Sequence, residues 1–215
     1  WFESMLAKTA NEVADLFSKY RLSEALMAIY KLYCDEFSGW YLEMIKPAYG
    51  QPINRATYEK TLDFFDRMLR LLHPFMPFIT EELWQALYER KNGESIMRES
   101  LHLDAPTDQE KALAADIELV KQIVSGVRMV RNQKNIAPKE SLVLQVVGIN
   151  HYEAYTDVIV KMANISEIDT VAEKDTTAAA FMVGTDEFAI PLGNMIDIAA
   201  EIEKQEAQLK HLEGF

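Results

Sequence analysis

The sequence has only one cysteine, Cys34, among its 215 residues. One thiol cannot form an internal disulfide, and such sparing use of cysteine is typical of a reducing compartment. No uninterrupted apolar run is long enough to cross a bilayer, and the first residues do not resemble a secretory signal peptide. These absences favour a cytoplasmic protein without a membrane partner. The chain also begins with Trp1 instead of methionine, so we expect a piece of a longer protein.

Signals of catalysis and cofactor binding are also missing. The eight glycines are scattered and form no phosphate-binding loop, and the four histidines lie far apart, without the spacing of metal ligands. Cys34 precedes two carboxylates, but neighbours on a helix point to different faces, so a buried structural thiol is expected. His73 is expected to be a structural histidine bonded to a helix-end carbonyl. The sequence therefore predicts no catalytic residue, metal site or cofactor within the chain.

The chain has little positive charge, since its formal net charge is −12. This balance argues against a general nucleic-acid binder, whose affinity comes mainly from neutralising phosphates. The densest basic set comprises Lys121, Arg128, Arg131, Lys134 and Lys139. Arg128, Arg131 and Lys134 follow at intervals of three residues and so share a helical face. These basic residues could form a strip on which a polyanion docks, but an ordinary solvated helix face explains them at least as well.

Apolar residues recur at helical spacing through the first half of the chain. They predict four helices with short links, at residues 1–20, 23–45, 56–73 and 80–89, which is typical of an antiparallel helical bundle. Residues 69–84 form an apolar bend in which two prolines restrict the backbone. We expect this bend to be buried, and Thr80 to cap the helix that follows it.

Four aromatic residues of the second predicted helix have two possible uses. Tyr33, Phe37, Trp40 and Tyr41 could stack on nucleic-acid bases. At helical spacing such residues more often belong to a core, and the core is favoured more strongly for Phe37 and Trp40 than for Tyr41.

In the second half of the chain, the spacing of apolar residues changes from that of helices to the alternation typical of strands. A long helix is predicted at 111–133, and a Val- and Leu-rich strand follows at 141–147. A helix at 152–163 and strands at 165–171, 178–183 and 187–191 complete a small α+β module. The last residues have a weak apolar repeat near heptad spacing, which indicates the beginning of a coiled coil. The expected fold is therefore mainly α, with a helical bundle at 1–110, a connector helix and α+β module at 111–192, and the start of a coiled-coil arm at 193–215.

Two segments, 33–47 and 71–84, resemble the anticodon-binding domain of class I aminoacyl-tRNA synthetases that charge large aliphatic amino acids. Two later segments narrow the resemblance to valyl-tRNA synthetases. Residues 127–138 are similar to the long helix of that family, and residues 190–197, with the helix after them, to the entry into its C-terminal coiled-coil arm. The spacing from Cys34 to Trp40 departs from the usual Phe-Cys-Asp-Trp-Tyr pattern, which leaves Cys34 without an assigned role.

The resemblance implies a C-terminal fragment whose parent enzyme attaches valine to tRNA-Val using ATP with Mg²⁺. The family's two catalytic signatures are absent, so the fragment should be inactive alone. The implied partners are tRNA-Val and the enzyme's own catalytic and editing domains, in a monomer. The residues expected to contact the tRNA are Trp1, Ser4, Lys8, Arg128, Arg131, Asn132 and Lys134. The alternatives are the bundle of an isoleucyl-tRNA synthetase and a helical protein–protein scaffold without an RNA role.

Overall fold

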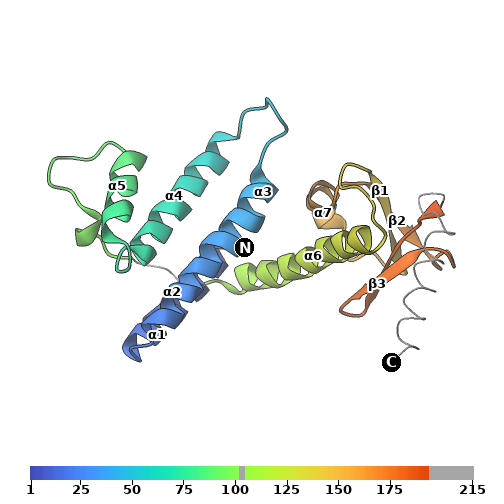
Figure 1. The fold of residues 1–215 in the computed structure, drawn as a ribbon, viewed down its shortest axis with the longest axis horizontal. Helices are drawn as coiled ribbons and strands as arrows, with labels where there is room; N and C mark the ends of the chain where they lie inside the picture. Colours follow the sequence, from blue (N-terminus) through green and yellow to red (C-terminus); the bar gives the residue numbers. More distant parts are fainter. Residues whose placement is uncertain (102–104, 194–215) are drawn as a thin grey trace, which may run out of the picture. The chain divides into compact units, whose positions relative to one another are not determined.

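A computed structural model of the chain describes residues 1–101 and 105–193 (Figure 1). The chain forms two compact units, of which the first runs from Trp1 to Ile117 and the second begins at Glu118. The described residues are mainly helical, with one small mixed sheet, as the sequence predicts. The predicted division of the chain at residues 110 and 192 remains a prediction. The predicted coiled-coil helix at 193–215 lies almost entirely outside the described residues.

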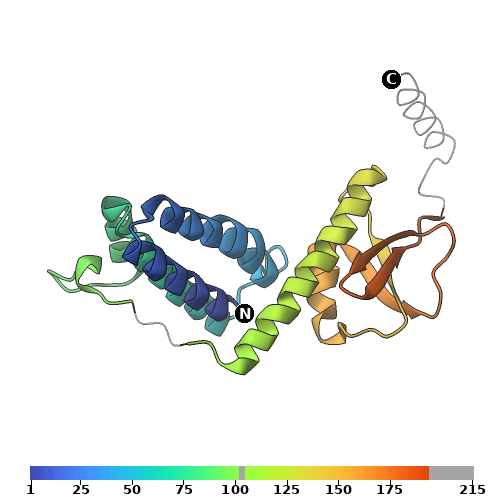
Figure 2. The ribbon, with the colours of Figure 1, turned by 90° about the horizontal axis from the view of Figure 1, so that it is seen from below.

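The first unit consists of helices whose positions follow the predicted ones closely. They are α1 (Phe2–Ser18), α2 (Leu22–Lys31), η1 (Leu32–Tyr41), α3 (Leu42–Ile45), α4 (Arg55–Leu72), α5 (Pro77–Leu87) and the short 3₁₀ turn η2 (Ile96–Arg98). The helix α1 lies beside α2 in both views (Figures 1 and 2). Asn54 starts α4, because its side-chain oxygen accepts hydrogen bonds from the backbone N–H groups of Ala56, at 2.9 Å, and Thr57.

The predicted helix at 23–45 exists, but its middle is a π-helix. The three segments α2, η1 and α3 follow one another without a break. The N–H of Leu42 donates to the carbonyl of Phe37, five residues earlier. A π-helix is rare and is found mostly as a short insertion within α-helices. Here it places Phe37 and Tyr41 in the core, where their rings stack at 5.5 Å.

The core of this unit is aromatic at its centre. Phe2, Phe37, Tyr41 and Phe64 have neighbouring ring centroids 4.9–5.5 Å apart. The core assignment is thus confirmed for Phe37 and Tyr41, while Tyr33 and Trp40 are only half-buried. The prediction of a buried Cys34 is wrong: its side chain is exposed, since η1 turns it away from the core.

The bend between α4 and α5 differs from the prediction in two ways. Thr80 is not the cap, because α5 already begins at Pro77 and Thr80 lies inside the helix. Its buried hydroxyl donates to the carbonyl of Met76 at 2.8 Å and lies 2.7 Å from Nδ1 of His73. His73 is thus a structural histidine, but its partner is a hydroxyl instead of a carbonyl.

The expected burial of the bend is confirmed at its two ends, where Leu69, Leu71 and Trp84 are buried, but is wrong at its middle. Phe78 is 89% exposed, Met76 49% and Ile79 42%. Only part of the bend packs inward: Phe75 lies against Phe17 of α1, with ring centroids 5.5 Å apart. The bend therefore presents apolar side chains to solvent.

The second unit packs one long helix on a small sheet. The helix α6 (Asp108–Gln133) contains the boundary between the units. The described strands are β1 (Leu142–Val147), β2 (Ile165–Val171), β3 (Ala179–Val183) and β4 (Asp186–Ile190), in the order β2-β1-β4-β3. The strands β1 and β2 are parallel, and the 3₁₀ turn η3 (Glu153–Tyr155) and α7 (Thr156–Ala163) connect them. The strands β3 and β4 form an antiparallel hairpin whose turn contains Gly184 at φ +59°.

Candidate nucleic-acid interface

The three predicted contacts at the start of α1 have different surroundings. Trp1 is half-buried, and its ring centroid lies 6.4 Å from that of Tyr41. Ser4 is 6% exposed and lies inside the unit. Lys8 is exposed and forms no ion pair with any described residue. Lys8 is therefore exposed to solvent and Trp1 is partly exposed, whereas Ser4 is buried.

Arg131 is not on a surface strip. It is 7% exposed, and its guanidinium donates to four backbone carbonyls: those of Ala137 at 3.2 Å, Glu140 at 2.7 Å, Ala163 at 3.2 Å and Asn164 at 2.7 Å. Burial lowers the pKa of Arg131 from its usual value. Arg131 thus binds the end of α6 to the loop before β1 and to the end of α7.

The other basic residues of α6 do not form one continuous surface. Lys121 is buried and pairs with Glu118 at 2.6 Å. Arg128 is exposed and donates to the carbonyl of Met162 at 3.1 Å. Asn132 is exposed and Lys134 is half-buried. The prediction of a continuous basic face is therefore wrong at Arg131, and Arg128 and Asn132 remain as exposed neighbours one helical turn apart.

The sequence reasoning missed the loop between α3 and α4. Tyr49 in this loop is fully exposed, and Tyr58 in the first turn of α4 is 49% exposed. Lys46 and Arg55 lie exposed at the two ends of the loop. Tyr49 stands beside Gly50 and near two prolines, so it cannot belong to a helical core stripe; that signal was available in the sequence.

This loop and the start of α1 lie at the same end of the unit. Tyr41 and Thr61 share a hydrogen bond of 3.1 Å between their hydroxyls, and Tyr41 also contacts Trp1. Lys60 of α4 pairs with Glu3 of α1 at 2.6 Å. We call this surface the α3–α4 end; it comprises Trp1, Lys46, Tyr49, Arg55, Tyr58 and Lys60.

The charges of the α3–α4 end are partly balanced by carboxylates. Lys46 lies 3.5 Å from Glu43, and Arg55 lies 2.7 Å from Glu59. Such exposed pairs contribute little free energy, so their cations can turn to a phosphate at small cost. Exposed aromatic rings beside Lys and Arg are the groups that bind unpaired RNA, since rings stack on bases and cations hold phosphates.

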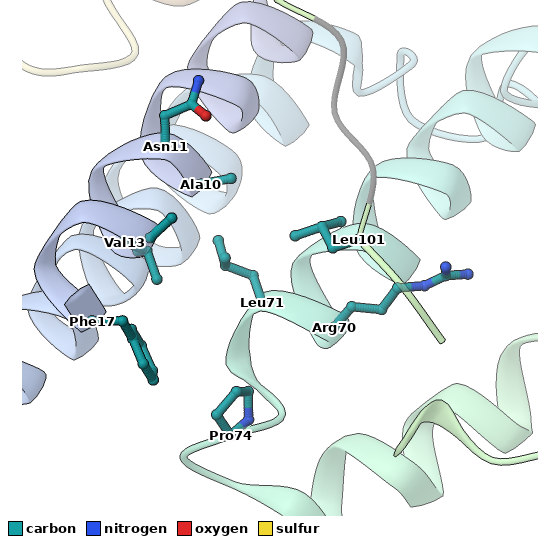
Figure 3. A pocket seen from close by; sticks show the side chains of 9 residues that line it. Ala10, Asn11, Val13, Phe17, Arg70, Leu71, Pro74 and Leu101 are labelled. Atoms are coloured by element: carbon teal, nitrogen blue, oxygen red, sulfur yellow. The ribbon is translucent and has the colours of Figure 1, made fainter. Parts of the chain in front are cut away.

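A cavity of about 450 Å³ lies between α1 and α4 (Figure 3). Seven of the nine residues that line it are apolar, among them Val13, Phe17, Leu71 and Leu101. The one cation in the lining, Arg70, is committed to Asp66 at 2.6 Å and Glu99 at 3.2 Å. Among the described residues of the lining, none is a nucleophile and no two form an acid–base pair. Across residues 1–101 and 105–193, no group of His, Cys, Asp and Glu could hold a metal ion, and no helix is long and apolar enough to span a membrane.

Comparison with known proteins decides the family. Residues 1–147 match the family described as the anticodon-binding domain of tRNA ligases. The chain belongs to this family. The match covers the whole first unit, together with α6 and β1, so the helical unit with the α3–α4 end is an anticodon-binding domain.

Valine–tRNA ligases are relatives of this chain over nearly its whole length. The whole chain is 62% identical to a stretch of the enzyme from Phocaeicola vulgatus and 60% identical to one from Bacteroides thetaiotaomicron, and covers 24% of each. The enzyme from Rhizobium meliloti is 31% identical over 94% of the chain, which covers 22% of that enzyme. The chain thus spans about a quarter of the length of the relatives that it matches.

Proposed function

We propose that the chain is the tRNA-binding part of a valine–tRNA ligase and receives the anticodon stem and loop of tRNA-Val. The observation that carries this proposal is the match of the whole chain to valine–tRNA ligases together with the anticodon-binding family match. In this proposal the antiparallel bundle of the first unit meets the RNA, and the end of the chain enters a coiled-coil arm. The parent enzyme acts in the cytoplasm as a monomer.

The chemistry of the ligase lies outside this chain. ATP, with Mg²⁺, supplies the energy to activate valine in the catalytic domain, which this chain lacks. These residues contribute to the positioning of the tRNA. The domain binds the far end of the tRNA, and this binding energy adds to that of the other domains. The catalytic and editing domains are thus the other partners of the chain.

The α3–α4 end is the surface that we assign to the anticodon loop. Tyr49 and Tyr58 offer exposed rings to splayed bases, and Lys46, Arg55 and Lys60 offer cations to the backbone. Trp1 and Lys8 extend this surface along α1. Arg128, Asn132 and Lys134 provide a second set of contacts from α6. Ser4 and Arg131 are left out, because both are buried.

The test compares two matched double variants of the chain. Tyr49→Ala with Arg55→Gln removes one ring and one cation from the α3–α4 end. Tyr30→Ala with Arg21→Gln removes an exposed tyrosine and the arginine of an exposed ion pair from elsewhere in the unit. We expect the first variant to bind tRNA-Val about tenfold more weakly, because one stacked base contributes about 1–3 kcal/mol.

Binding is measured across a salt series, with tRNA-Val and with the same tRNA carrying a changed anticodon. Loss of one phosphate contact should reduce the slope of log affinity against log salt by about 1. A preference for the native anticodon that disappears with Tyr49→Ala supports base readout at this end. Equal weakening by both double variants contradicts the assignment of the α3–α4 end.

A further inference from the structure

The helix α5 has two flanks of opposite character. On the polar flank, the carboxylate of Glu81 accepts hydrogen bonds from Gln85 at 2.8 Å, from the Ser95 hydroxyl at 2.7 Å and from the N–H of Ile96 at 3.2 Å. These bonds hold the segment before η2 against α5. Between the flanks, Thr80 and Trp84 are fully buried and face α4. One flank and the inner face of α5 are therefore covered by this chain.

The other flank is apolar and only partly covered. It carries Met76, Ile79, Leu83 and Ala86, which we call the α5 seam. Met76, Ile79 and Leu83 are 49%, 42% and 37% exposed, so the described part of the chain covers them only in part. Phe78, which is 89% exposed, lies farther around the helix. An apolar row of this kind on a single helix marks a surface that another element covers.

The spacing of the seam identifies the kind of element. The intervals are three, four and three residues, which is the a/d repeat that packs side chains of one helix between those of another. A facing helix with its own apolar repeat would bury all four residues. A strand or an irregular segment offers no matching period.

The charges around the seam exclude two other occupants. Glu82 of α5 and Glu89, two residues past the end of α5, are exposed, and the chain has a net charge of −12. Carboxylates beside an apolar row repel the phosphates of an RNA. A second copy of the chain would bring its own acidic helix and the same negative charge. The complementary occupant is a helix with apolar a/d residues and Lys or Arg beside them.

We propose that the α5 seam is the docking site of an amphipathic, basic-flanked helix from the part of the ligase polypeptide that this chain does not include. The chain spans 24% of its valine–tRNA ligase relatives, so most of such a polypeptide lies outside it. This inference rests on the proposed function, since it requires the chain to work within a longer ligase. It names the surface on which that longer protein holds its anticodon-binding domain.

The experiment measures how fast a thiol on the seam reacts with a water-soluble maleimide. Ile79→Cys is placed in a Cys34→Ser background, both in this chain and in the full-length ligase. The matched control is Leu26→Cys on α2, since Leu26 is 40% exposed. We expect Ile79→Cys to react about tenfold or more slowly in the ligase than in the chain, because a packed side chain reacts only during local opening. A slowing at Ile79 that is no greater than the slowing at Leu26 overturns the proposal.

Light scattering tests the second-copy alternative. We expect the isolated chain to have the mass of a monomer. A dimer that Ile79→Glu converts to a monomer would show that the occupant is another copy and would overturn the proposal. Neither measurement involves tRNA, and the Ile79→Cys chain should bind tRNA-Val as the unaltered chain does. Failure of the docking site is therefore distinguishable from failure of the proposed function.

Discussion

Gly126 of α6 and Phe181 of β3 meet so closely that no side chain fits between them. A Cβ atom on Gly126 would lie 2.2 Å from Cε2 of the Phe181 ring. The ring cannot move aside easily, because it is 8% exposed and stacks on Phe188 with centroids 5.4 Å apart. The glycine therefore sets the distance at which α6 packs on the sheet.

Gly126→Ala should therefore destabilise the second unit. Overpacking of this kind costs about 1–3 kcal/mol, and the better helix propensity of alanine offsets only part of it. Urea unfolding, followed by circular dichroism, measures the change in the free energy of unfolding. Ser125→Ala, at the exposed neighbouring position, serves as the control and should change it by less than about 0.5 kcal/mol. Equal stability of the two variants would contradict the close packing.

Arg131→Lys should lower stability even though it keeps the positive charge. A lysine cannot reach four carbonyls with one fixed fork of donors, so some of the carbonyls of Ala137, Glu140, Ala163 and Asn164 lose their bonds. We expect a loss of about 2 kcal/mol in the free energy of unfolding. Arg128→Lys, at an exposed site with one such bond, is the control. If Arg131 acted mainly as a charge for RNA, Arg131→Lys would leave stability unchanged.

Glu3 should make stability depend on acid pH. The hydrogen bond from Arg67, helped by Lys60, lowers the pKa of Glu3 from 4.5 to about 2. A lowered pKa contributes stability that is complete above about pH 4.5 and is lost as the pH falls toward 2. Glu3→Gln should remove on the order of 1 kcal/mol at pH 7, after allowance for solvent screening, and should flatten the acid limb. Thermal unfolding from pH 7 to pH 2 measures both effects. Glu59→Gln, which removes a more exposed partner, should change neither.

Thr80→Val should weaken the bend between α4 and α5. The valine keeps the shape but loses the hydroxyl, which leaves Nδ1 of His73 without its 2.7 Å partner. We expect a loss of about 1–2 kcal/mol, because a polar atom left unpaired in a part-buried site costs more than the bond itself contributes. Thr80→Ser retains the hydroxyl and should recover most of the loss. Equal destabilisation by both variants would point to packing of the methyl group instead.

The positions of helices and strands followed from local signals. The strand β2 and the helices α1, α4 and α6 lie within a few residues of their predicted limits, since periodicity and turn residues act over short distances. Arg131 could not be assigned in this way. Its four carbonyls belong to residues 137–164, and only the folded chain brings them to the end of α6. The charge pattern alone made it look like a surface residue.

The exposed bend shows a second limit of sequence reasoning. Apolar composition predicts burial, but it does not say whether the covering element belongs to the same chain. Met76, Phe78 and Ile79 are apolar and exposed together, and the prediction failed there. Tyr49 was missed for the opposite reason: a single aromatic residue in a short loop gives no periodic signal, although its neighbours already excluded it from a core.

The π-helix η1 lies between α2 and α3, which are α-helical and continuous with it. A residue in an α-helix turns the chain by about 100°, and a residue in a π-helix turns it by less, because the hydrogen bonds of a π-helix reach back five residues instead of four. The segment that follows η1 consists of α3 and the loop with Tyr49. If Leu32–Tyr41 were a regular α-helix, this loop would face a different side of the unit. The π-helix thus sets the direction in which the surface that we assign to the anticodon faces.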